Sequence, residues 1–143
     1  MTATVTIKTL GQNDAELFTR VAPAVFDHEP KPHLTSELLN DPRHHLVVAL
    51  HGEQIVGFVS AVHYVHPDKP AELFINEVGV APTHWHEGLG RKLLGEMLTL
   101  ARRLGCRNAW VLTDRSNAPA MHLYQALGGK ESPVPQVMFE FVV

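Results

Sequence analysis

The sequence predicts a mixed α/β fold in which one central sheet carries helices on its faces. Strand-like and helix-like segments follow one another in the order β-α-α-β-β-β-α-β-α-β, and no repeat or linker interrupts them. A chain of 143 residues is ordinarily one domain, and a domain of about this size buries roughly 68–70% of its unfolded surface. Hydrophobic residues make up 45% of the chain and charged residues 19%, as in an ordinary globular protein. We therefore expect one domain over residues 1–143.

The first third of the chain predicts one strand and two helices. Residues 4–9 alternate β-branched side chains, which is typical of a strand. Residues 11–14 offer caps for a helix that a proline at position 23 would kink or shorten. A loop with two prolines at 26–33 separates it from a short helix at 34–39. The apolar stripe of the first helix would consist of Leu17, Phe18, Val21 and Val25.

Strands dominate the rest of the chain. Residues 45–50 and 55–62 are a candidate hairpin around a turn at 51–54. Another strand starts at Leu73 and breaks at the proline turn 81–83, and the long helix that follows it should end at Gly105. The remaining elements are a strand at 109–113, a short helix opened by 116–119 and closed by Gly128-Gly129, and a last strand at 137–143.

The stretch from Leu73 to Arg91 carries the clearest functional signal. An apolar strand ends in Val78-Gly79-Val80, and Gly88-Leu89-Gly90 opens a helix whose apolar residues recur at helical spacing over 91–104. The first turn of a helix has free N–H groups and a positive dipole end, and glycines let a phosphate approach the backbone. This context predicts an anion-binding site, and an ordinary turn into a helix is the alternative interpretation.

These residues resemble a known coenzyme loop. Val80-Ala81-Pro82, a gap, and then Gly88-x-Gly90-Arg91 resemble the coenzyme A pyrophosphate loop of the GNAT superfamily of N-acetyltransferases. That loop usually has Gln or Arg three residues before its first Gly, where this chain has Trp85. The resemblance extends over nearly the whole chain. It implies a central mixed, mostly antiparallel sheet of six to seven strands with about four helices, splayed at strands 4 and 5, and acetyl-CoA as co-substrate.

A second segment supports the same family. Asn117 and Tyr124 lie seven residues apart and therefore share a helix face. Tyr124 by itself is equally a half-buried packing residue. The pattern Asn-x-x-Ala-x-x-x-Tyr-x-x-Leu-Gly over 117–128, however, resembles the second coenzyme motif of the family, whose tyrosine is the usual donor of a proton to the departing thiolate. The resemblance implies these cofactor-binding residues: Val78, Gly79, Val80, Glu87, Gly88, Leu89, Gly90, Arg91, Lys92, Asn117 and Tyr124.

Glu77 is a candidate for chemistry on the amine. Strand alternation places Leu73, Ile75, Glu77 and Gly79 on one face and Asn76 and Val78 on the other. A carboxylate among the hydrophobic residues of a strand is costly to bury without a partner. Glu77 is therefore expected either to form a salt bridge or lie on an exposed edge strand, or to hold an ammonium ion and accept its proton. In the family an acidic residue at this strand position often serves as that base. The implied catalytic pair is Glu77 and Tyr124.

The acceptor is predicted from weaker features. The chain most resembles the small aminoglycoside 3-N-acetyltransferases, through Phe26-Asp27, Glu77, Ala126-Leu127-Gly128 and Val137-Met138. A polycationic amine would suit an acidic cleft formed by Asp27, Glu29, Glu77 and Glu140. His28 is a substrate contact, an alternative base or a solvated loop residue. Acetylation of a polyamine or of a peptide or protein N-terminus remains open, as does a non-catalytic coenzyme-binding module.

Composition argues against several other partners and ligands. A net charge of −3 and a pI near 6.3 imply no broad basic surface for nucleic acid. Cys106 is the only cysteine and favours a reducing, cytoplasmic compartment, and no apolar run is long enough to cross a membrane. His63-x-x-His66 and His84-x-His86 lack the further ligands of a zinc site, so no metal is expected. Homodimers are common among members of the family that the chain resembles, so a second copy of the chain is a possible partner.

Overall fold

The computed structural model describes residues 4–143, which form two compact units. The first unit extends to Leu112 and contains the sheet, and the second is Thr113–Val143. Each unit is described separately below.

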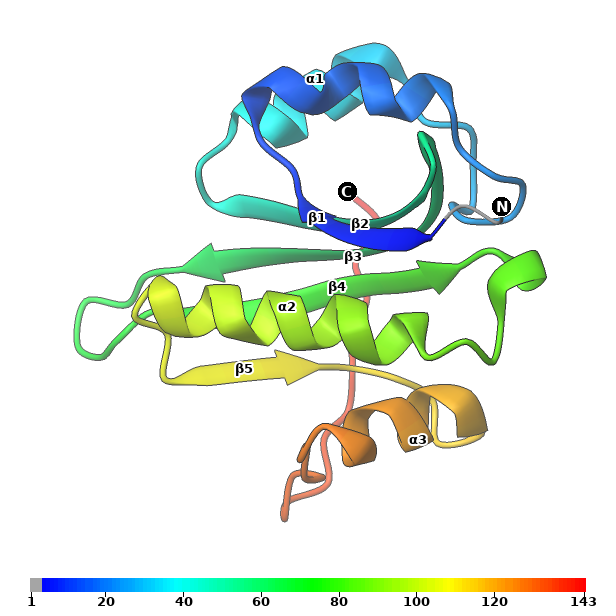
Figure 1. Ribbon diagram of the computed structural model, residues 1–143. Coiled ribbons are helices and arrows are strands. Elements are labelled where there is room, and N and C mark those ends of the chain that lie inside the picture. The colour runs from blue at the N-terminus through cyan, green and yellow to red at the C-terminus, as the bar shows by residue number, and fades with distance from the viewer. Residues whose placement is uncertain (1–3) are drawn as a thin grey trace. The chain divides into compact units, whose positions relative to one another are not determined.

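The first unit is built on one five-stranded sheet (Figure 1). Neighbouring strands are antiparallel except for the last pair, β4 and β5, which is parallel. The strands follow the chain in spatial order as β1 (Val5–Thr9), β2 (His44–His51), β3 (Gln54–Tyr64), β4 (Glu72–Val80) and β5 (Asn108–Val111). The predicted first strand, the 45–62 hairpin and the strand from Leu73 are therefore confirmed.

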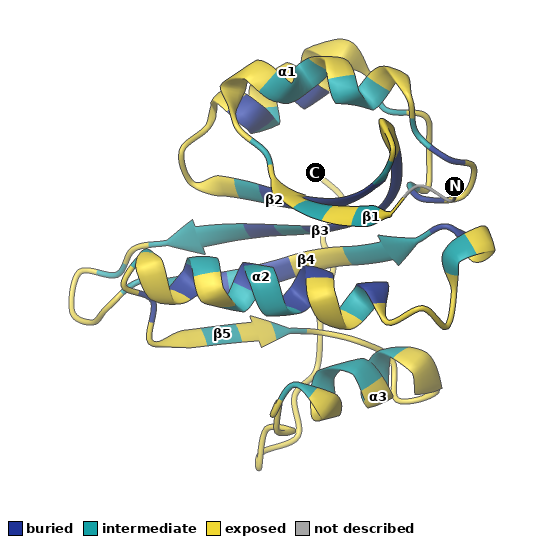
Figure 2. Ribbon diagram, in the orientation of Figure 1, coloured by how far each residue is buried: buried dark blue, intermediate teal, exposed yellow. Residues whose placement is uncertain are grey.

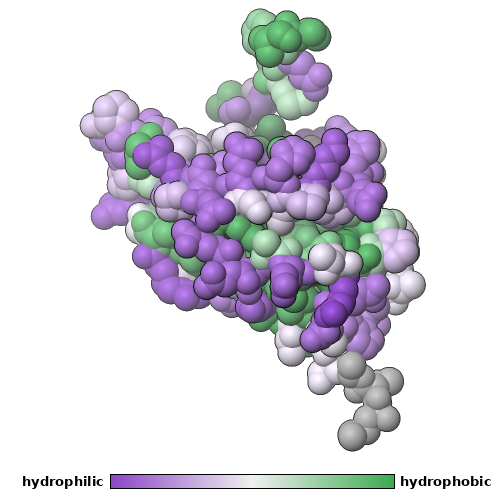
Figure 3. Space-filling view, turned by 90° about the horizontal axis from the view of Figure 1, so that it is seen from above, coloured by the Kyte–Doolittle hydropathy of each residue, from purple (hydrophilic) through white to green (hydrophobic). Residues whose placement is uncertain are grey.

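Each face of the sheet is covered by different helical segments. Helix α2 (Leu89–Arg103) lies on one face, where a Cβ added at Gly57 would come within 3.2 Å of the Leu93 side chain. The 3-10 helix η1 (Gln12–Thr19), the loop that follows it and helix α1 (Pro32–Asn40) lie on the other face, where the Phe26 ring stacks on Phe58. Seen from above, the outer surface of this second layer is largely hydrophilic, with apolar side chains visible between the polar ones (Figure 3).

The core lies where β2 and β3 meet α2 (Figure 2). Helix α2 has the amphipathic pattern expected of it, and it ends in a Schellman arrangement in which Gly105 has φ 81° and Cys106 N–H donates to the Ala101 carbonyl at 3.0 Å. The largest fully buried side chains are Ile55, Leu73, Leu93, Met97, Val47, Val48, Val56 and Val59.

A β-bulge in β4 overturns the expected alternation of its side chains. Ser60 pairs with Glu77 and Ala61 with Ile75, so Asn76 is an extra residue on β4. Directly paired residues share a face, and an inserted residue reverses the side chains that follow it. Leu73 and Ile75 therefore lie on the α2 face with Val78, whereas Glu77 and Gly79 lie with Ser60 and Phe58 on the opposite face.

The first predicted helix is shorter than its apolar stripe. It is a 3-10 helix that ends at Thr19, before Val21 and Val25. The chain beyond it is held extended against β3, because Ile55 N–H donates to the Arg20 carbonyl and Ala22 N–H donates to the Ile55 carbonyl. Val21 consequently forms a parallel bridge to Ile55 instead of a helical turn.

The second unit contains helix α3 (Ala118–Ala126) and an extended C-terminal segment. Asn117 caps the helix, as expected, and Gly128 and Gly129 close it in a second Schellman arrangement. The predicted strand at 137–143 is wrong for this single chain, because no partner strand pairs with the segment among the described residues. The sheet accordingly has five strands instead of six to seven. Over residues 4–143, no helix is long and apolar enough to cross a membrane.

Candidate functional site

Strands β4 and β5 separate halfway along β4. Their pairing begins at Glu72 with Asn108 and ends at Ile75 with Val111. On the other side, pairing of β4 with β3 continues to Val80. Within residues 4–112, no strand pairs with the β5 side of Asn76–Val80. This is the predicted splay at strands 4 and 5, and it leaves a stretch of backbone donors and acceptors available along the segment expected to bind the coenzyme.

The N-terminus of α2 is open in the way an anion site requires. Gly88 is the N-cap in the left-handed conformation, with φ 77° and ψ 15°, and no side chain caps the helix. The N–H of Lys92 donates to the Gly88 carbonyl at 3.3 Å, so Leu89, Gly90 and Arg91 present the N–H groups that precede intrahelical bonding. A Cβ added at Gly88 would meet nothing within 4 Å, and the Arg91 and Lys92 side chains are exposed. These features fit a diphosphate.

The loop between β4 and α2 is braced by side chains that sequence analysis did not single out for this purpose. His84, at the end of the short 3-10 helix η2 (Pro82–His84), places Nε2 2.7 Å from Nδ1 of His51 at the end of β2. Its Nδ1 lies 2.8 Å from Thr83 Oγ1. Trp85, which stands where the family usually has Gln or Arg, donates its indole N–H to the Val80 carbonyl at 2.8 Å. Of the histidines in the His84-x-His86 pattern, His84 therefore contributes to the shape of the loop.

A pocket of about 390 Å³ lies beside Glu77 on the η1–α1 face of the sheet. Glu77 and Asn76 from β4 and Ser60 from β3 contribute to its polar wall, and the remaining polar residues of the lining are His28, Glu29, Lys31 and Thr35. Glu77 itself is exposed, so its position in the strand requires no buried ion-pair partner. The apolar wall consists of Phe18, Phe26, Leu34, Leu38, Leu46 and Phe58.

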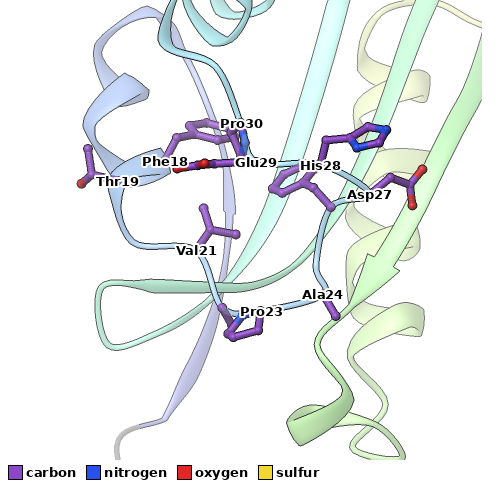
Figure 4. A pocket seen from close by; sticks show the side chains of 11 residues that line it. Phe18, Thr19, Val21, Pro23, Ala24, Asp27, His28, Glu29 and Pro30 are labelled. Atoms are coloured by element: carbon purple, nitrogen blue, oxygen red, sulfur yellow. The ribbon is translucent and has the colours of Figure 1, made fainter.

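The loop 21–30 separates this pocket from a second one of about 320 Å³. In the close-up of the second pocket, the Asp27 carboxylate and the His28 ring point to one side and the Glu29 carboxylate to the other (Figure 4). Both His28 and Glu29 line the two pockets, whereas Asp27 lines only the second. Of the acidic residues expected in the acceptor cleft, Glu29 and Glu77 therefore share a pocket, and Asp27 does not line it.

The pocket and the open strand edge are joined by consecutive residues. The bulge at Asn76 directs Glu77 into the pocket, and the next residues, Val78–Val80, have no strand on their β5 side within residues 4–112. An amine in the pocket and a ligand chain along β4 would therefore be close neighbours. Sequence analysis missed the pocket walls formed by α1 and Phe58, because no local pattern indicates that segments so far apart in the chain meet.

The second unit carries the remaining predicted residues. The Asn117 Oδ1 accepts a hydrogen bond from the Ala120 N–H at 3.2 Å, which occupies one side of its amide. Tyr124 is half-buried, and this burial raises the pKa of its phenol above the ordinary value. The hydroxyl is therefore protonated throughout the neutral pH range, as a proton donor must be. Glu140 is exposed in the C-terminal segment.

Comparison with known proteins identifies the family. A model of the acetyltransferase (GNAT) family matches residues 14–129. The chain belongs to the acetyltransferase (GNAT) family. Among GNAT relatives, the N-alpha-acetyltransferase RimI of Mycobacterium tuberculosis is 32% identical over 129 residues, which are 89% of this chain and 79% of that protein. The streptothricin acetyltransferase of Streptomyces lavendulae is 34% identical over 88 residues, which are 62% of this chain but only 44% of that protein.

Solved GNAT structures share the fold at low sequence identity. An aminoglycoside acetyltransferase from an uncultured soil metagenomic sample, in complex with sisomicin, superimposes with a TM-score of 0.81 at 19% identity and covers 96% of this chain and 97% of that one. A ribosomal-protein-alanine N-acetyltransferase from Brucella melitensis biovar Abortus has a TM-score of 0.74 at 19% identity and covers 96% and 100%. These similarities establish the GNAT fold of the chain, with its mixed sheet and flanking helices.

Proposed function

We propose that the chain transfers an acetyl group from acetyl-CoA to a primary amine. The observation that supports this most directly is the succession of three features along one segment: Glu77 in a pocket, the unpaired edge of Val78–Val80, and the uncapped start of α2 at Gly88. In this proposal the acceptor amine occupies the pocket, the thioester lies along the strand edge, and the diphosphate binds at the start of the helix. The family membership of the chain supplies the donor, acetyl-CoA.

In the proposed reaction the amine attacks the thioester directly in a ternary complex. The N–H groups of Leu89, Gly90 and Arg91 hold the diphosphate, and backbone groups of Val78–Val80 align the rest of the coenzyme. Glu77 accepts the proton of the ammonium, directly or through a water, because only the neutral amine is nucleophilic. The new C–N bond forms as the C–S bond breaks, and a backbone N–H near Val78 stabilises the oxyanion.

Tyr124 completes the proposed proton balance. The departing thiolate takes the phenolic proton of Tyr124, so one proton leaves the amine and one reaches sulfur. This assignment is supported by the coenzyme motif over 117–128 and by the raised pKa of the phenol. Cys106 is buried, and burial raises the pKa of its thiol, which makes it a poor nucleophile. A covalent acetyl-cysteine is therefore not part of the scheme.

The first candidate acceptor is an aminoglycoside, modified at its 3-N position. Two carboxylates, Glu29 and Glu77, line the pocket, and Asp27 and Glu140 are further acidic residues proposed for the cleft. A polycation gains affinity from such complementary charge. Several fold neighbours are aminoglycoside acetyltransferases, one of them solved with sisomicin. Acetyl-CoA chemistry on such an acceptor is consistent with the proposed cytoplasmic location and with a role in antibiotic resistance.

The second candidate acceptor is the α-amine of a peptide or protein. The RimI relative matches 89% of this chain at 32% identity, a higher identity than that of the aminoglycoside-modifying neighbours. The pocket also has an apolar wall, in which the Phe26 ring stacks 4.2 Å from Phe58. Such a wall suits the side chain of an N-terminal residue better than a sugar hydroxyl.

A thiol-release assay with an amine panel tests both acceptors. The full chain is incubated with acetyl-CoA and aminoglycosides, spermidine or short peptides with a free α-amine, and free thiol is followed over time. Turnover with aminoglycosides, followed by mass spectrometric location of the acetyl group, supports the first candidate, and turnover with peptides alone supports the second. Binding of acetyl-CoA without turnover of any amine would contradict the enzymatic proposal and leave a coenzyme-binding module.

A further inference from the structure

The loop 21–30 carries two residues of the pocket beside Glu77, namely His28 and Glu29 (Figure 4). The backbone hydrogen bonds that fix this part of the chain end at Ala22 and resume at Lys31. Among residues 4–143, no backbone hydrogen bond involves any residue from 23 to 30. The position of this part of the loop therefore depends on packing.

One packing contact brings the backbone of the loop directly onto β4. A Cβ added at Gly79 would lie 2.5 Å from the carbonyl oxygen of Val25 and 2.8 Å from the ring of Phe58. Neither distance leaves room for a side chain, and a backbone oxygen cannot rotate away as the end of a flexible side chain can. A glycine within a strand often marks such a close approach of another backbone. The missing side chain of Gly79 is therefore what admits the loop.

This contact lies next to the pocket. Gly79 follows Glu77 by two residues and lies on the same face of β4. Beside it, the Phe26 ring of the loop stacks on Phe58, which pairs with Gly79 across the strands. Ala24 has φ 64°, a left-handed conformation that a residue other than glycine keeps only where the surrounding contacts hold it. The loop is thus docked at a defined point beside Glu77.

The backbone of Gly79 faces the sheet and not the open edge of β4. The N–H of Ala81 donates to the Val56 carbonyl at 2.8 Å, so the polar backbone groups of Ala81 face β3. These groups alternate between the two sides of a strand, so those of Gly79 also face β3, whereas those of Val78 and Val80 face away from it. A substitution at Gly79 should therefore act on the loop before it acts on a coenzyme bound along the open edge.

We propose that Gly79 is a positioning residue for the amine acceptor. Its missing side chain lets the loop 21–30 rest on β4, and this contact sets the positions of His28 and Glu29 relative to Glu77. A loop held further from the strand would widen the pocket, so the amine would bind less tightly and in a poorer orientation. The inference rests on the acetyl transfer proposed above and assigns Gly79 to the acceptor side of that reaction.

The first test is Gly79→Ala, assayed with the amine identified in the panel. The added methyl group would meet the Val25 carbonyl, so the loop must move away from β4. The kcat/KM for the amine should fall about tenfold to 10²-fold, mainly through KM, because a misplacement of about 1 Å can cost about 10²-fold. The Kd for acetyl-CoA, measured by calorimetry, should stay within about twofold. A folded variant with an unchanged KM for the amine, or with an equal loss of affinity for acetyl-CoA, would overturn the inference.

The second test approaches the same contact from the loop and does not depend on the folding of Gly79→Ala. Val25 is only 5% exposed but lines neither pocket, so Val25→Ala acts on the pocket through the position of the loop. It should raise the KM for the amine about three- to tenfold, less than Gly79→Ala does, and leave the Kd for acetyl-CoA unchanged.

Val47→Ala is the matched control for Val25→Ala. Val47 is a fully buried valine of β2 that lines neither pocket, so its truncation should destabilise the protein at least as much and leave the KM for the amine unchanged. An unchanged KM in Val25→Ala, or an equal rise in Val47→Ala, would overturn the inference, because the amine would then respond to general stability or to neither residue. A wild-type chain that acetylates no amine would instead overturn the proposed reaction, and this inference with it.

Discussion

Among single residues, Glu77 should report most directly on the chemistry of the pocket. Glu77→Gln keeps the size of the side chain and removes its ability to accept a proton. We expect kcat/KM to fall about 10²- to 10⁴-fold, the usual contribution of a general base, and the pH profile to shift to higher pH, because only amine that has already lost its proton in solution can then react. Steady-state kinetics across pH with the amine found in the panel measures both.

Glu29→Gln is the matched control for Glu77→Gln, because both carboxylates line the same pocket. If Glu29 only attracts the cation, its loss should raise KM by about tenfold or less and leave kcat and the pH profile unchanged. A Glu77→Gln enzyme with an unaltered pH profile would transfer the role of base to His28 or to water.

Tyr124 is the second residue with a defined expected effect. Tyr124→Phe removes only the hydroxyl, so kcat should fall by about 10²-fold or more while the Kd for acetyl-CoA, measured by calorimetry, stays within about twofold. Because burial raises the pKa of the phenol, the wild-type enzyme should lose activity through this group only at pH values above the ordinary tyrosine range. An unchanged kcat would remove Tyr124 from the mechanism and leave it as a packing residue.

The chemical role of a side chain could be predicted from the sequence more readily than the direction in which that side chain points. A carboxylate one residue before Val78 was a sound candidate on its type alone, but strand alternation put it on the same face as Leu73 and Ile75, which the structure shows to be covered by α2. The extra residue Asn76 reverses that face, and nothing in the local sequence distinguishes a bulge from a regular strand. The same holds for Asp27 and Glu29, which are near neighbours in the sequence but point to different sides of the loop.

At the scale of elements, the loop that leads into α2 depends on a histidine pair. The hydrogen bond between His51 and His84 ties this loop to the end of β2. His51→Ala should therefore weaken acetyl-CoA binding by about three- to tenfold, since a hydrogen bond of this kind is worth about 0.5–1.5 kcal/mol. The kcat at saturating acetyl-CoA should change little, because the brace acts on the loop and not on the reacting atoms.

Calorimetric titration with acetyl-CoA measures that effect, and His44→Ala is the control. His44 lies at the other end of β2 and is exposed, so its loss should leave the Kd unchanged. Equal affinities for wild type and His51→Ala would mean that the glycine backbone alone sets the shape of the loop.

Long helices and strands with a regular hydrophobic repeat could be predicted from the sequence. Elements whose ends depend on contacts with residues far away in the chain could not. Helix α2 follows from its apolar repeat and from Gly105, both of which are local. The end of η1 depends on hydrogen bonds between Arg20, Ala22 and Ile55, which are far apart in the sequence. The strand expected at 137–143 has the right composition, but it pairs with no strand among residues 4–143, and a strand forms only against a partner strand.

At the scale of the whole molecule, pH should act on stability through a half-buried histidine pair outside the pocket. His45 on β2 places Nε2 2.7 Å from Nδ1 of His63 on β3, and the two rings stack. Burial, and then the positive charges that His63 and His44 would carry, lower the pKa of His45 to about 4, while Asp41 acts weakly in the other direction. In the unfolded chain the same group has its ordinary pKa of about 6.5.

The direction of the effect follows from these two values. Between pH 6.5 and pH 4 the unfolded chain binds a proton that the folded chain does not, so the stability present above pH 6.5 is lost as the pH falls toward 4. Allowing for the partial exposure of the ring, we expect the free energy of unfolding to fall by about 2 kcal/mol over this range. Urea denaturation at pH 7.5 and at pH 4.5 measures the difference. His45→Gln should remove most of it and His44→Gln should retain it, whereas an equal pH dependence in wild type and His45→Gln would place the sensitivity in other groups.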